Sequence, residues 1–223
     1  MNFVEYPDRE LLMIDLADRI ASELTSALQT HDRATLSVPG GTTPGPVFDV
    51  LSDVDLDWPR VSVILNDERW VPEDSPRSNT ALLKKRLLCG KASPAELVPL
   101  YLPAETPEDR LDDVADGLKP HLPISVLLLG MGADMHTASL FPGADNLKAA
   151  LSADAPPVMA MRADGAGEPR ITLTAPVLQS AMSTHVLITG SEKREALERA
   201  RALPVEDAPI RAVLKHATIH WAE

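Results

Sequence analysis

The sequence contains one cysteine, Cys89, among its 223 residues. A single cysteine cannot form an intramolecular disulfide, so the chain needs no oxidising compartment and we expect a cytoplasmic location. Cys89 precedes Gly90 near the expected end of a helix, and a cysteine in that position is more often a packing residue than a nucleophile. The thiol is therefore not the reactive group that we expect.

Basic residues are also scarce, with 21 Lys and Arg against 33 Asp and Glu, for a formal net charge of -12. This balance disfavours a nucleic-acid partner, because such binding depends on clustered basic side chains that neutralise phosphates. A small anionic ligand remains possible, since a few focused cations and backbone N–H groups can hold one inside an acidic protein.

The chain has no apolar run long enough to span a bilayer. Its first residues lack the basic and apolar regions of a signal peptide, so we expect neither secretion nor a membrane partner. With 44% hydrophobic and 24% charged residues, the composition is that of an ordered globular protein. The length permits two small domains, but we predict one, spanning residues 1–223.

The sequence does contain a regular alternation of helical periodicity and apolar strands. Apolar residues recur every fourth position after Asp8, which predicts an amphipathic helix with that residue as its N-cap. Helices are expected at 8–29, from 44 onward, and at 79–88, 106–118, 175–181, 192–200 and 210–214. Strands are expected at 34–38, 61–65, 124–129, 158–161, 170–173, 185–189 and 218–221. This order predicts an α/β fold with a mostly parallel sheet and helices on both faces.

Three polar tracts directly follow predicted strands: 40–43, 66–69 and 132–137. In parallel α/β sheets, ligands bind at the carboxyl ends of the strands near a topological switch point. The three tracts are far apart in the sequence, yet this rule predicts that they meet at one edge of the sheet.

The first tract has the composition of a phosphate cradle. Gly40 and Gly41 let backbone amides approach a ligand closely, and Thr42 and Thr43 add hydroxyl donors. Thr43 is the expected N-cap of the next helix, with Pro44 at the first helical position. The tract matches neither the P-loop nor the dinucleotide fingerprint, so nucleotide binding is not indicated. A tight turn with a helix cap is the structural alternative.

Three basic residues lie at the edges of predicted strands or helices, and each can pair with a phosphate group: Arg69, Arg170 and Lys193. A basic residue of this kind, taken alone, is more often a surface charge or part of a structural ion pair than a phosphate ligand.

His136 is the candidate general base, because it follows the most apolar strand and has Asp134 two residues before it. An imidazole can accept a proton from water near neutral pH, and a nearby carboxylate can fix its tautomer. Zinc-like spacing of ligands and the Gly-x-Ser-x-Gly motif are both absent, so we predict no metal site and no serine triad.

The tract from Gly130 to Gly143 reads GMGADMHTASLFPG and is similar to the 6-phosphogluconolactonase family signature G-x-G-x-D-G-H-T-A-S-L-F-P. The resemblance extends in family order to residues 40–44, 66–69 with 78–79, 169–172 and 190–193. It implies a fold shared with glucosamine-6-phosphate deaminase and ribose-5-phosphate isomerase-like proteins.

The same resemblance implies hydrolysis of 6-phospho-D-glucono-1,5-lactone to 6-phosphogluconate in the oxidative pentose phosphate pathway, without a cofactor. It implies that His136 is the general base. Residues implied or predicted to hold the phosphorylated lactone are Gly40, Gly41, Thr42, Thr43, Asp67, Arg69, Arg170 and Lys193.

One position departs from the family pattern, since Met135 replaces the glycine before the histidine. If this position requires a positive φ, methionine costs about 1–2 kcal/mol and can shift the loop. Two alternatives remain open. An amino-sugar phosphate deaminase or isomerase would carry a further acidic residue where this chain has Leu140 and Phe141, and a non-catalytic sugar-phosphate-binding module would normally carry a DNA-binding helix pair.

Overall fold

The computed structural model describes residues 1–223 and contains a central sheet of seven strands. In sheet order these are β1 (Asn2–Glu5), β10 (Thr218–Ala222), β9 (Ser183–Thr189), β6 (Val126–Gly130), β2 (Ala34–Val38), β3 (Val61–Leu65) and β5 (Glu96–Val98). Every neighbouring pair is parallel, which confirms the predicted sheet type. The sequence analysis missed β1 and β5, which are short strands at the two edges.

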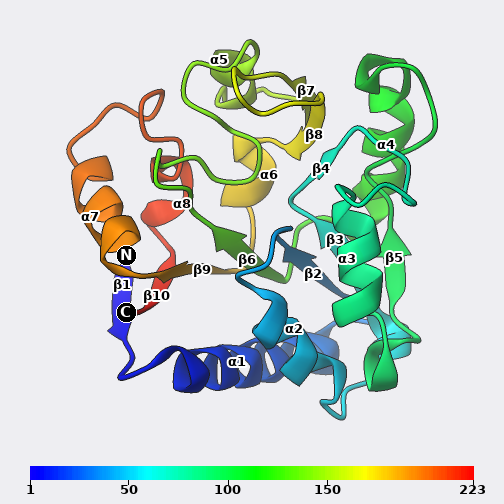
Figure 1. Ribbon diagram of the computed structural model, residues 1–223. Coiled ribbons are helices and arrows are strands. Elements are labelled where there is room, and N and C mark those ends of the chain that lie inside the picture. The colour runs from blue at the N-terminus through cyan, green and yellow to red at the C-terminus, as the bar shows by residue number, and fades with distance from the viewer.

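A second sheet of three antiparallel strands lies beyond the carboxyl edge of the first (Figure 1). It consists of β4 (Asp67–Arg69), β8 (Arg170–Leu173) and β7 (Val158–Met161). The bounds predicted for β7 and β8 are confirmed, but the polar tract 67–69 forms a strand rather than only the end of one. Because a single residue, Asn66, separates β3 from β4, the chain passes directly from the main sheet into the small one.

Eight α-helices complete the fold: α1 (Arg9–Thr30), α2 (Gly45–Ser52), α3 (Asn79–Arg86), α4 (Leu111–Leu118), α5 (Leu147–Ala150), α6 (Ala175–Gln179), α7 (Ser191–Ala200) and α8 (Arg211–Leu214). Short 3₁₀ turns occur at Trp58–Arg60, Gly90–Ala92, Pro107–Arg110 and Lys119–His121. In Figure 1, α1 and α2 lie below the main sheet and α6 and α8 above it, so both faces are covered as predicted. None of these helices combines the length and the apolar character that crossing a membrane requires.

Helix starts follow the predicted capping with one exception. Asp8 caps α1 by accepting a hydrogen bond from the Leu11 N–H at 2.8 Å. The prediction that Thr43 caps α2 is wrong, because the helix begins at Gly45 and has no side-chain cap. The Gly45 N–H instead bonds to the Thr42 carbonyl at 3.1 Å, which closes a turn and leaves the Thr43 hydroxyl free of a capping role.

The core is one cluster of 56 buried residues, and every residue of β2 and β3 is buried.

The buried side-chain amide of Asn66 links three strands at the carboxyl edge of the main sheet. The Asn66 side chain accepts a hydrogen bond from Ser37 at 2.7 Å and donates one to the Leu128 carbonyl at 2.8 Å. These bonds tie β2, β3 and β6 together at the edge where their polar tracts emerge.

Candidate active site

A cleft of about 240 Å³ opens at the carboxyl edge of the main sheet. It is lined by Pro39, Gly40, Gly41, Thr43, Pro44, Asp67, Arg69, Asn79, Leu129, Gly130, Met131, Gly132, His136, Ala138, Phe141, Arg170, Leu187 and Lys193. The three polar tracts therefore meet, as predicted. They meet at the topological switch point of the sheet, where β2 has β3 as its neighbour on one side and β6 on the other.

Thr42 and Asp134 are the two predicted site residues that do not line the cleft. The turn closed by the Thr42 carbonyl leaves Gly41 and Thr43 on the cleft side and Thr42 exposed to solvent. The Thr42 side chain therefore lies outside the lining of the cleft. Asp134 lies behind the cleft and contacts it through the histidine.

The His136 ring is held by the carboxylate of Asp134. His136 Nδ1 lies 2.5 Å from Asp134 Oδ1, and the His136 backbone N–H bonds to the same oxygen at 3.2 Å. The hydrogen bond from His136 lowers the pKa of Asp134, so this carboxylate is ionised and accepts the proton on Nδ1. The neutral ring then carries its proton on Nδ1 and leaves Nε2 free to accept one.

The loop that carries His136 has a strained backbone. Met135 has a φ of 66° and Ala138 a φ of 50°, both in the left-handed region that favours glycine. Three hydrogen bonds hold the loop: Gly132 N–H to the His136 carbonyl at 3.0 Å, Met135 N–H to the Gly132 carbonyl at 2.9 Å, and Ile210 N–H to the Met135 carbonyl at 3.1 Å. The family glycine is thus replaced by methionine at a position that does require a positive φ.

We expect Met135→Gly to be more stable than Met135→Ala by about 1 kcal/mol, the reverse of the usual order. Both variants lose the methionine side chain, but only glycine relieves the left-handed strain. Urea unfolding of the two purified variants measures the difference. An alanine variant at least as stable as the glycine variant would show that the strain at this position is negligible.

Two arginines enter the cleft from the small sheet, because Arg69 of β4 pairs directly with Arg170 of β8. Arg170 Nη1 lies 3.8 Å from Asp67 Oδ2, and its Nη2 donates to the Ala166 carbonyl at 3.0 Å. Burial lowers the pKa of Arg170, and the charge of Asp67 opposes that effect. The Nε atoms of both arginines are buried without a hydrogen-bond partner, so both guanidinium groups retain donor capacity.

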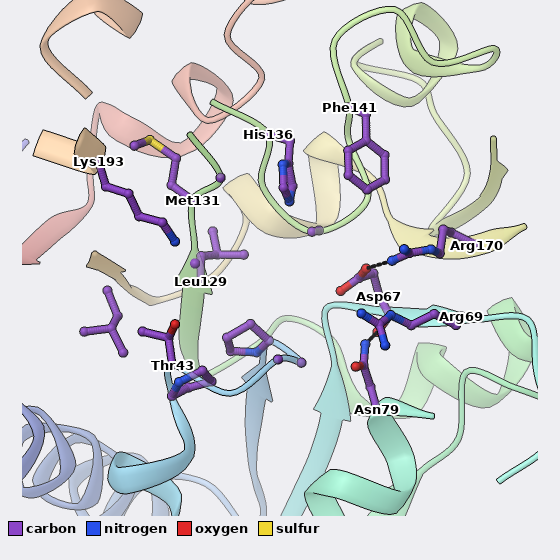
Figure 2. A pocket seen from close by; sticks show the side chains of 18 residues that line it. Thr43, Asp67, Arg69, Asn79, Leu129, Met131, His136, Phe141, Arg170 and Lys193 are labelled. Atoms are coloured by element: carbon purple, nitrogen blue, oxygen red, sulfur yellow. Dashed lines mark hydrogen bonds and ion pairs between the residues drawn. The ribbon is translucent and has the colours of Figure 1, made fainter. Parts of the chain in front are cut away.

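The remaining cation approaches from the opposite wall. Lys193 belongs to the first turn of α7, and Figure 2 shows its side chain reaching toward the centre of the cleft from the side away from Arg69 and Arg170. The Gly190–Lys193 tract does open a helix after a strand, as predicted. A ligand in the cleft therefore lies between positive charges on both sides.

Gly40 and Gly41 are each required by the structure, but for different reasons. Gly41 has a φ of 82°, which other residues rarely adopt. A Cβ on Gly40 would lie 2.1 Å from Cγ of Asn79, so the Asn79 side chain packs directly against the glycine backbone. Sequence reasoning did not assign a role to Asn79, although Ser78-Asn79 belongs to the resemblance.

Phe141 is a second cleft residue that sequence reasoning missed. Its ring lies between His136 and Arg170 in Figure 2. The centroid of the Phe141 ring lies 4.5 Å from the centroid of the His136 ring and 5.7 Å from the Cζ atom of Arg170. The signal was present in the sequence, because Phe141 belongs to the tract 130–143 that resembles the family signature. The ring packs against both functional side chains.

Asp67 connects the histidine loop to the small sheet. Its carboxylate is buried, accepts a hydrogen bond from the Ser139 hydroxyl at 2.5 Å and faces Arg170. In the cleft, this acceptor complements the donors of the arginines and can bind a hydroxyl group of a ligand.

Comparison with known proteins places this fold and cleft in a family. Residues 7–221 match the family described as glucosamine-6-phosphate isomerases/6-phosphogluconolactonase. A 6-phosphogluconolactonase of Rhizobium meliloti (strain 1021) is 44% identical over 215 residues, which cover 93% of this chain and 92% of that protein.

Solved structures agree. The crystal structure of a 6-phosphogluconolactonase from Shewanella baltica OS155 has a TM-score of 0.96 at 34% identity and covers 100% of this chain and 98% of that one. A monomeric glucosamine-6-phosphate deaminase of the NagB superfamily has a TM-score of 0.83 at 18% identity, covering 100% and 98%, and shares the fold. The resemblance seen in the motifs is confirmed, and this chain belongs to the glucosamine-6-phosphate isomerase/6-phosphogluconolactonase family.

Proposed function

We propose that this chain hydrolyses 6-phospho-D-glucono-1,5-lactone to 6-phospho-D-gluconate, a reaction of the oxidative pentose phosphate pathway. The observation that carries the proposal is the hydrogen-bonded His136–Asp134 pair in a cleft that also receives Arg69, Arg170 and Lys193. The cations suit a phosphorylated ligand, and the histidine suits the activation of water. Relatives that cover nearly the whole chain are named 6-phosphogluconolactonases.

In the proposed reaction, Nε2 of His136 takes a proton from a water molecule, whose oxygen attacks the lactone carbonyl carbon. Asp134 keeps Nδ1 protonated and stabilises the imidazolium ion that forms. Backbone N–H groups of the loop that carries His136 stabilise the oxyanion of the tetrahedral intermediate. The bond from that carbon to the ring oxygen then breaks, and the imidazolium returns its proton to this oxygen as the open acid forms.

The substrate is held at both ends of the cleft. Backbone groups of Gly40 and Gly41, the hydroxyl of Thr43 and the cationic side chains bind the phosphate group. Asp67 accepts a hydrogen bond from a sugar hydroxyl and maintains the position of Arg170. No step requires a cofactor or a metal ion.

The direct test is hydrolysis of freshly generated 6-phosphogluconolactone, corrected for spontaneous ring opening. Turnover well above the spontaneous rate supports the proposal, and a rate equal to it would overturn the proposal. Ammonia release from glucosamine 6-phosphate, measured in parallel, tests the deaminase alternative. Binding of either sugar phosphate without turnover would instead identify a non-catalytic module.

We further propose that residues 1–223 act as one 6-phosphogluconolactonase-like domain in the cytoplasm, with a phosphorylated sugar lactone as the ligand and no nucleic-acid partner. One continuous core supports the domain assignment, and the single cysteine suits a reducing compartment. Cell fractionation tests the location, and recovery of the protein in an oxidising compartment would contradict it. Light scattering of the purified chain would establish whether it is a monomer or a dimer.

A further inference from the structure

Glu68 lies at the centre of β4, between two residues that line the cleft. Because side chains alternate along a strand, Asp67 and Arg69 face the cleft while Glu68 points to the other side. Its side chain is 0% exposed, and none of the ion pairs in the structure involves it. A buried carboxylate without a cation must be compensated by hydrogen bonds.

Five donors surround the Glu68 carboxylate. Oε1 accepts the Arg69 N–H at 2.8 Å and the Asn79 N–H at 2.9 Å. Oε2 accepts the Thr80 N–H at 2.7 Å, the Thr80 hydroxyl at 2.8 Å and the Ser78 hydroxyl at 3.4 Å. The carboxylate therefore binds the first turn of α3 and the backbone of β4 at the same time.

Both of these segments carry cleft residues. Asn79 donates from Nδ2 to the Asp67 carbonyl at 3.3 Å, and its side chain packs against the backbone of Gly40. Arg69 is the next residue after Glu68, and its backbone N–H is one of the five donors. A shift of the carboxylate would displace Arg69 and Asn79 relative to Gly40.

We propose that Glu68 is a positioning residue whose carboxylate fixes Arg69 and Asn79 against the Gly40–Gly41 loop, so that the phosphate-binding wall of the cleft is formed before the ligand arrives. Donors that are already in place avoid the ordering cost that a mobile wall would add to each binding event. This inference rests on the proposed function, which places a sugar phosphate in the cleft.

The test uses the isosteric variant Glu68→Gln, which replaces one acceptor oxygen by an NH₂ group that faces donors. We expect the Kd for 6-phosphogluconate, the stable product, to rise roughly tenfold or more, because hydrogen bonds to a charged group are lost. Isothermal titration calorimetry measures Kd and stoichiometry separately. A raised Kd at unchanged stoichiometry supports the positioning role.

Reduced stoichiometry at an unchanged Kd would mean that Glu68 only stabilises the fold, and this would overturn the inference. So would a wild-type Kd at full stoichiometry. Ser125→Ala is the matched control, because it removes the acceptor of the buried Thr35 N–H, at 3.0 Å, just before β6 and away from the cleft. It should lower stability and leave the Kd unchanged.

If Glu68→Gln does not fold, Thr80→Val removes one hydroxyl donor and keeps the carboxylate. We then expect a rise in Kd of about threefold, and an unchanged Kd would overturn the inference.

Binding by the wild type distinguishes failure of the proposed function from failure of the Glu68 inference. A wild type that does not bind 6-phosphogluconate overturns the proposed function together with this inference, whereas wild-type binding with an unaffected glutamine variant overturns the inference alone.

Discussion

Replacing His136 by alanine is expected to lower kcat for lactone hydrolysis by about 10²–10⁴-fold, the usual contribution of a general base. KM should stay within about threefold of the wild-type value, because the cations that hold the phosphate remain. The ring is partly exposed, at 31% of its side-chain surface, so the variant should fold. Progress curves with fresh lactone, corrected for spontaneous opening, give both constants.

Asp134→Asn provides a second variant for the same step. An asparagine amide can donate to Nδ1, which moves the ring proton to Nε2 and blocks the nitrogen that must accept the proton from water. We therefore expect a loss of kcat that approaches that of His136→Ala. A kcat for His136→Ala within threefold of the wild type would contradict the role of this histidine as the base.

The second large effect concerns stability at acid pH, and it originates in a partly buried network between α1 and the main sheet. Tyr6 donates from its hydroxyl to Asp15 at 2.5 Å and lies 2.9 Å from His220 Nδ1. His220 Nε2 lies 2.9 Å from His185 Nδ1, and His185 Nε2 lies 2.8 Å from Glu23. The network joins α1, β9 and β10 to Tyr6, the residue that follows β1.

His220 is neutral in this network, because burial lowers its pKa from 6.5 to about 3. The neighbouring His185 and Arg19 side chains also lower the pKa of His220, while the carboxylates of Asp15 and Glu23 oppose this effect. In the unfolded chain the imidazole titrates near 6.5, so below that pH the unfolded state binds a proton that the folded state excludes. Stability therefore falls as the pH drops from about 6.5 toward 3.

The lowered pKa of His220 corresponds to a loss of about 4 kcal/mol of unfolding free energy once the pH has fallen to about 3. The lowered pKa values of Asp15 and Glu23 act in the same direction, because their stabilising ionised forms are lost as the pH falls through those values. At the other extreme, burial raises the pKa of Tyr6 to about 12. Stability should therefore also decline above about pH 10, where the unfolded phenol ionises first.

Urea unfolding at several pH values between 7.5 and 4 measures the acid effect. We expect His220→Gln to be less stable than the wild type at pH 7.5 and to show a clearly flatter pH dependence below 6.5. His216→Gln, a substitution at an exposed position, should retain the wild-type slope. Parallel curves for His220→Gln and the wild type would mean that another group controls acid unfolding.

Local sequence patterns determined the elements and the place of the cleft. The runs 34–38 and 61–65 form strands with the predicted bounds, because a strand buried on both faces consists mainly of apolar and small residues. The polar tracts after these strands meet because parallel strands end at one edge of the sheet. The sequence therefore predicted the pairing of Asp134 with His136, and it also predicted that Lys193 opens a helix.

Only the tertiary structure decided which distant groups touch. The antiparallel pairing of β4 with β8 brings Arg69 opposite Arg170, and nothing within either segment specifies that partner. Glu68 lies in a polar tract whose local pattern does not predict burial, yet donors from α3 make its burial possible. The hydrogen bond between Tyr6 and His220 joins residues 214 positions apart. The hydrophobic periodicity of a segment predicts which of its residues are buried, but contacts between distant segments depend on how whole helices and strands pack together.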